Sequence, residues 1–62
     1  MNAPDAVEYF LIEIREATPK ESHISADQWY RYWKLRYQER FPASSTQDYD
    51  RFISGLTDLL GL

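Results

Sequence analysis

The sequence predicts an all-α protein, a compact three-helix bundle that forms a single domain over residues 1–62. Apolar residues recur at the spacing of one helical face in three separate segments, and no segment keeps the alternation typical of a strand. Two prolines, Pro19 and Pro42, interrupt the pattern. The connections between the segments are of ordinary length for helix–helix links. We expect the helices over about residues 4–18, 26–41 and 46–60.

The first helix is expected to begin near Pro4, because proline suits the first helical turn, where its missing N–H costs nothing. Asn2 or Ala3 is the expected N-cap. Pro19 disfavours helical geometry at the residue before it, so the helix should end there. The apolar residues that share one face of this helix are Val7, Phe10, Leu11 and Ile14.

The second helix has the clearest start signal in the chain. Ser25 followed by Gln28 forms a predicted capping box, and Ile24 with Trp29 can form a hydrophobic staple around it. We expect Trp33 to be buried against both other helices. The residues at helical spacing on the same side are Ala26, Trp29, Tyr30, Trp33, Tyr37 and Phe41.

The third helix is expected to begin after Ser44 or Ser45, since either serine can act as its N-cap. Gly61 suits a left-handed closing position, from which Leu62 would fold back on Leu56. This pattern predicts a natural chain end rather than a truncation. The single apolar stripe of this helix comprises Tyr49, Phe52, Ile53, Leu56, Leu59 and Leu60.

Composition limits the functions that such a chain can have. At 62 residues the core is thin, and dense packing or oligomerisation must support it. The absence of cysteine excludes disulfides and thiolate metal sites, and one histidine cannot form a structural zinc site. We therefore expect no metal and no cofactor. No apolar run is long enough to span a membrane, and no signal peptide is recognisable, so we expect a cytoplasmic protein without a membrane partner.

No residue pattern indicates a catalytic site, and we expect that the protein is not an enzyme. His23 lies beside Ser22 and Ser25, but no third group is evident that would orient it for nucleophilic catalysis. Both glycines lie within the third helical segment, so no phosphate-binding loop is present. The paired carboxylates are interpreted as solvated charge: Glu13 with Glu16, and Asp48 with Asp50.

The outer side of the second helix carries residues that do not fit a simple core stripe. Tyr32 and Leu35 fall opposite the main apolar face, and Arg31 and Arg36 flank them. Tyrosine and arginine around an exposed aliphatic residue are typical of interaction hot spots. The same pattern also fits a middle helix that is buried between two neighbours. The sequence leaves both explanations open.

The first helix also carries apolar residues outside its core stripe. Tyr9 and Ile12 lie opposite that stripe, among acidic residues. Acidic and basic faces with apolar centres can meet within one chain or between two chains, where complementary charge gives specificity. We therefore expect a small helical interaction protein that self-associates or docks on a larger protein. The expected partner-binding residues are Arg31, Tyr32, Leu35, Arg36, Tyr9 and Ile12.

Nucleic-acid binding is the alternative interpretation of the second helix. Arginines among Trp and Tyr can contact phosphates and stack on bases. Four of the seven basic residues of the chain lie within this helix: Arg31, Lys34, Arg36 and Arg40. The net charge of −3 argues against this alternative, and we prefer the protein-binding interpretation.

Overall fold

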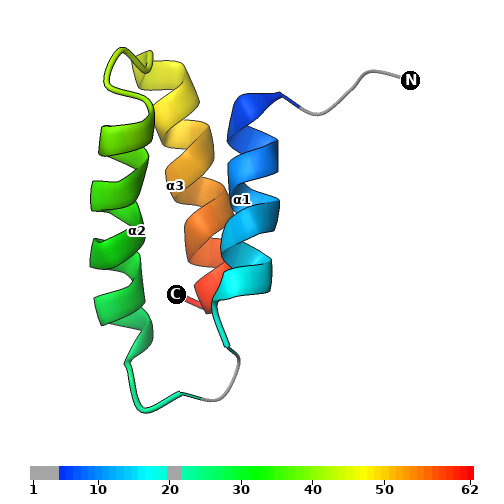
Figure 1. Cartoon of the computed structure of the whole chain (residues 1–62), viewed down its shortest axis with the longest axis vertical. Helices are drawn as coiled ribbons and strands as arrows, with labels where there is room; N and C mark the ends of the chain where they lie inside the picture. The colour runs from blue at the N-terminus through cyan, green and yellow to red at the C-terminus, as the bar shows by residue number, and fades with distance from the viewer. Residues whose placement is uncertain (1–4, 20–21) are drawn as a thin grey trace.

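The computed structural model describes residues 5–19 and 22–62, and these residues form an up–down–up bundle of three helices (Figure 1). The described residues contain no strand. The predicted all-α three-helix bundle is therefore confirmed. The helices are α1 (Ala6–Ala17), α2 (Ala26–Arg40) and α3 (Thr46–Leu60).

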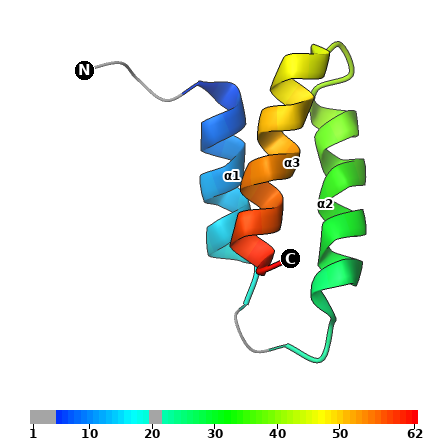
Figure 2. The ribbon, with the colours of Figure 1, turned by 180° about the vertical axis from the view of Figure 1, so that it is seen from behind.

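Helix α3 is the central packing element, because both α1 and α2 pack chiefly against it (Figure 2). Aromatic rings join the three helices. The ring of Phe10 in α1 lies 6.0 Å from Trp33 in α2 and 5.8 Å from Phe52 in α3, measured between ring centroids. Tyr37 stacks on Phe52 at 4.1 Å. The buried core consists of Val7, Phe10, Ile14, Trp33, Tyr37, Phe52 and Leu56.

Trp33 is 8% exposed, so its predicted burial is confirmed. Its ring meets Phe10 edge to face, and its indole N–H donates a hydrogen bond of 2.9 Å to the hydroxyl of Thr18. Thr18 is the C-cap of α1, so this bond ties the end of α1 to the middle of α2. Trp33 also belongs to the core cluster to which Phe52 and Leu56 of α3 contribute.

The predicted capping box at the start of α2 is confirmed. The Ser25 hydroxyl accepts the Gln28 backbone N–H at 3.2 Å, and the Gln28 side chain accepts the Ser25 N–H at 3.1 Å. Of the two serines proposed for α3, Ser45 is the N-cap. Ser44 instead forms a hydrogen bond with the Tyr37 hydroxyl, so the polar group of this core residue has a partner.

The predicted N-cap of the first helix is wrong. Asn2 and Ala3 lie outside the described residues, and Asp5 caps α1 by accepting the backbone N–H of Glu8 at 3.0 Å. This hydrogen bond, together with a 2.6 Å contact from the Arg51 guanidinium, lowers the pKa of the Asp5 carboxyl. A carboxylate at a helix N-terminus is favoured both as an acceptor and by the helix dipole.

The end of α3 closes as predicted, except for the last side chain. Gly61 adopts the left-handed conformation, with a φ of 73 degrees. The N–H of Leu62 donates to the carbonyl of Thr57 at 2.9 Å, as in a Schellman motif. Leu62 is 60% exposed and is not part of the core around Leu56, so the expected packing of these two residues is wrong. The backbone hydrogen bonds are sufficient to close the helix.

Ser25→Ala leaves the Gln28 N–H without its capping acceptor. Loss of such a cap is expected to lower the free energy of unfolding by about 0.5–2 kcal/mol. Urea denaturation followed by circular dichroism measures the change. Ser54→Ala in α3 is the matched control, since Ser54 is exposed within a helix and should tolerate alanine. An unchanged midpoint for Ser25→Ala would show that the capping box does not stabilise α2.

Candidate interaction surface

The outer face of α2 is exposed. We define this face by its six residues Gln28, Arg31, Tyr32, Leu35, Arg36 and Glu39. Leu35 is 62% exposed and Tyr32 is 45% exposed. No other described element covers them, so the explanation of α2 as a middle helix buried between two neighbours is wrong. An exposed leucine beside an exposed tyrosine places apolar area at the centre of this face.

Ion pairs border the apolar centre. Arg31 lies 3.5 Å from Asp27, and Arg36 lies 3.6 Å from Glu39. All four side chains are more than half exposed to solvent. Exposed pairs of this kind each contribute little to stability, because water screens the charges and ordering the side chains costs entropy. These charges can therefore exchange partners on contact with another surface at little cost.

The ring of Tyr32 is held in place by its neighbours. It meets Trp33 edge to face with 4.9 Å between ring centroids, and Trp29 at 5.8 Å. The guanidinium of Arg36 lies over the same ring at 5.8 Å. Tyr32 thus continues the buried aromatic cluster to the surface. A rigid aromatic side chain loses little entropy when a partner covers it.

The outer side of α1 is exposed as well. Tyr9 is 58% exposed and Ile12 is 46% exposed. Glu13 and Glu16 beside them are also exposed. The outer side of α1 and the outer face of α2 therefore do not pack against each other. The expected option that these two faces meet within one chain is wrong.

A groove between α1 and α2 adjoins the outer face of α2. The buried residues Phe10 and Trp33 line it, and Glu13 of α1 and Arg36 of α2 contribute to its walls. The guanidinium of Arg40, also in the wall, lies 6.0 Å from the Phe10 ring centroid. The groove is thus bordered by charges of both signs, and Arg36 belongs to both the groove and the outer face.

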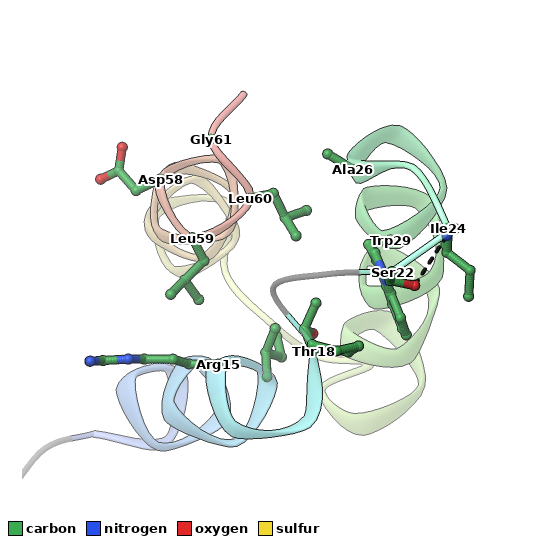
Figure 3. A pocket seen from close by; sticks show the side chains of 12 residues that line it. Arg15, Thr18, Ser22, Ile24, Ala26, Trp29, Asp58, Leu59, Leu60 and Gly61 are labelled. Atoms are coloured by element: carbon green, nitrogen blue, oxygen red, sulfur yellow. Dashed lines mark hydrogen bonds between the residues drawn. The ribbon is translucent and has the colours of Figure 1, made fainter.

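A second hollow, of about 430 Å³, opens where α1 and α3 end and α2 begins (Figure 3). Ile14 of α1, Leu60 of α3 and Trp29 of α2 contribute apolar walls. The Trp29 indole nitrogen is buried and has no hydrogen-bond partner among the described residues. Periodicity alone did not indicate this hollow, because it is formed by the ends of three different helices.

The residues considered for catalysis have structural roles or lie in solvent. The Ser22 hydroxyl accepts the backbone N–H of Ile24 at 3.1 Å, and the Ser25 hydroxyl serves in the capping box. His23 between them is exposed. Of the paired carboxylates, Asp48 alone is partly buried.

No described helix is both long and apolar enough to cross a bilayer. Within residues 5–19 and 22–62, no three side chains of the types that commonly bind metals cluster together. Comparison of the chain with protein-family models, curated proteins and solved structures gave no match.

Proposed function

We propose that this chain is a small non-enzymatic interaction protein that binds a protein surface, on a second copy or on a larger protein, through the outer face of α2. The observation that carries the proposal is the exposure of Tyr32 and Leu35 between Arg31 and Arg36. Burying this apolar area against a partner is favourable, and tyrosine and arginine are enriched where binding energy concentrates. The absence of cysteine, and therefore of disulfides, is compatible with action in the cytoplasm, where thiols are kept reduced.

The electrostatics of α2 favour a protein over a nucleic acid as the partner. Asp27 and Glu39 on the same helix partly neutralise Arg31 and Arg36. Lys34 lies 5.1 Å from the ring of Tyr30 rather than extending from the outer face. A phosphate backbone would have to compete with these contacts and with a net charge of −3.

Leu35→Glu is expected to leave the fold intact and to abolish partner binding, because it places a charge in an interface that excludes water. Leu62→Glu is the matched control, since Leu62 is 60% exposed and lies outside this face. Circular dichroism checks the fold. Capture on the immobilised chain, compared between the two variants, measures binding to other proteins, and light scattering measures self-association.

Two results would contradict the proposal. If Leu35→Glu binds as the unmodified chain does, the outer face of α2 is not the interface. If random single- or double-stranded DNA causes salt-sensitive chemical-shift changes confined to Arg31, Lys34 and Arg36, and Leu35→Glu still binds it, the chain is a nucleic-acid-binding protein.

A further inference from the structure

We infer that the partner on the outer face of α2 is a second copy of this chain, with the two α2 helices antiparallel across a two-fold axis at Leu35. This inference rests on the proposed function and specifies its partner. The spacing of apolar and charged residues along the exposed side of α2 supports it.

The outer face of α2 has the spacing of a helix-packing seam. Gln28, Tyr32, Leu35 and Glu39 follow one another at intervals of four, three and four residues. At about 100° per residue they lie within about 60° of one another around the helix. This is the repeat by which two helices pack side by side. Leu35 is the one aliphatic residue of the seam and is near its middle.

Two of the three charged residues on the outer face of α2, Arg31 and Glu39, are complementary to each other when a second copy is antiparallel. The third, Arg36, is next to Leu35 and comes near Arg36 of the other copy, and its charge is partly offset by its ion pair with Glu39. Arg31 and Glu39 lie four residues before and four residues after Leu35. Antiparallel pairing about Leu35 therefore brings Arg31 of each copy level with Glu39 of the other, and the dimer gains two opposite-charge pairs. Parallel pairing would place Arg31 beside Arg31 and Glu39 beside Glu39. Antiparallel helix dipoles are also mutually favourable.

The acidic outer side of α1 is the competing surface for the outer face of α2. Contact between α1 of one copy and α2 of the next joins two different surfaces, and such contacts form open chains unless their rotation closes a ring. Contact between two α2 helices uses the same surface on both copies and closes with two molecules. The charge symmetry about Leu35 matches the closed arrangement.

The small area of the outer face of α2 predicts a weak dimer that forms only at high protein concentration. The described chain exposes 4844 Å² in total. A standard interface buries about 800 Å² on each partner, roughly one-sixth of that surface. One helix of 15 residues, about 22 Å long, provides less than this area. We therefore expect weak association that stabilises a chain with only a thin core.

Charge reversal tests the antiparallel arrangement. Arg31→Glu and Glu39→Arg each bring like charges together twice in a dimer, so each variant alone should raise the dissociation constant by about tenfold or more. An equimolar mixture of the two variants restores two opposite-charge pairs and should dimerise again. Sedimentation equilibrium over about three decades of concentration measures the masses.

Asp27→Ala is the matched control, because it removes the ion-pair partner of Arg31 within the helix but no contact across the axis. It should dimerise like the unmodified chain, and circular dichroism should show each variant folded. A mixture that stays monomeric while the unmodified chain dimerises would overturn the antiparallel pairing.

A monomeric unmodified chain at every concentration would overturn the inference of a second copy. The comparison of Leu35→Glu with Leu62→Glu for binding to other proteins would then still decide the proposed function. A dimer that survives Leu35→Glu would overturn the inference and show that self-association uses another surface.

Discussion

Trp33→Ala is expected to leave most of the chain unfolded at room temperature. Truncation of a large core aromatic costs about 3–5 kcal/mol, and the core of a domain this small rarely supplies more than about 3–5 kcal/mol in total. The substitution removes the edge-to-face contact with Phe10 and the hydrogen bond to Thr18 together. Because Trp33 is 8% exposed, water cannot fill its place without solvating the core.

Far-UV circular dichroism and urea denaturation measure this loss. Trp33→Phe keeps an aromatic ring but removes the indole N–H, so it should unfold at an intermediate urea concentration and reveal the contribution of the Thr18 bond. Gln38→Ala is the control, since Gln38 is an exposed residue of the same helix, and this variant should stay folded. A cooperative, fully helical Trp33→Ala variant would show that α1 and α2 do not depend on this ring.

Core residues were predictable where their burial depends only on which side of their own helix they lie. Helical spacing correctly placed Trp33 and Tyr37 in the core, and it placed Phe52 and Leu56 there as well. Leu59 belongs to the same predicted stripe but is 39% exposed. Spacing gives the direction of a side chain around its own helix, whereas burial also depends on how near a neighbouring helix lies at that level.

The residues of the candidate surface were predictable from the sequence, but their exposure to solvent was not. The sequence identified Tyr32 and Leu35 as residues outside the main stripe of α2, and their spacing fits equally well a helix covered on two sides. Only the packing of α1 and α2 on α3 shows that the outer face of α2 is left open.

Long-range polar contacts also could not be read from the sequence. The bond from Trp33 to Thr18 joins residues 15 positions apart, and Arg51 reaches Asp5 across 46 positions. Neither pair follows a local motif. The wrong N-cap of α1 has a different cause, because Asp5 caps through the backbone N–H of Glu8 three residues later, a local signal that the expected helix start at Pro4 disregards.

The helical Gly55 of α3 lies directly against the Leu11 side chain of α1. A Cβ atom at this position would lie 2.6 Å from a terminal methyl carbon of Leu11 and 3.2 Å from the other. These distances are shorter than ordinary carbon–carbon contacts, so a larger side chain must displace Leu11 or separate the helices. The glycine therefore leaves room for the Leu11 side chain to pack against the backbone of α3.

Gly55→Val is expected to lower the free energy of unfolding by about 1–3 kcal/mol, as overpacking of a core does. Valine is not a poorer helix former than glycine, so any loss of stability comes from packing. Ser54→Val at the neighbouring exposed position should change stability by less than about 0.5 kcal/mol. Urea denaturation of both variants measures the difference.

Leu11→Ala provides the decisive comparison, because it removes the methyl groups that valine at position 55 would meet. The variant Leu11→Ala is itself expected to be less stable, since it loses apolar contact with the core. Adding Gly55→Val to it should then cost less than adding Gly55→Val to the unmodified chain, and the difference is the coupling energy of the two positions. Equal costs in both backgrounds would show that Leu11 is not what limits the side chain at position 55.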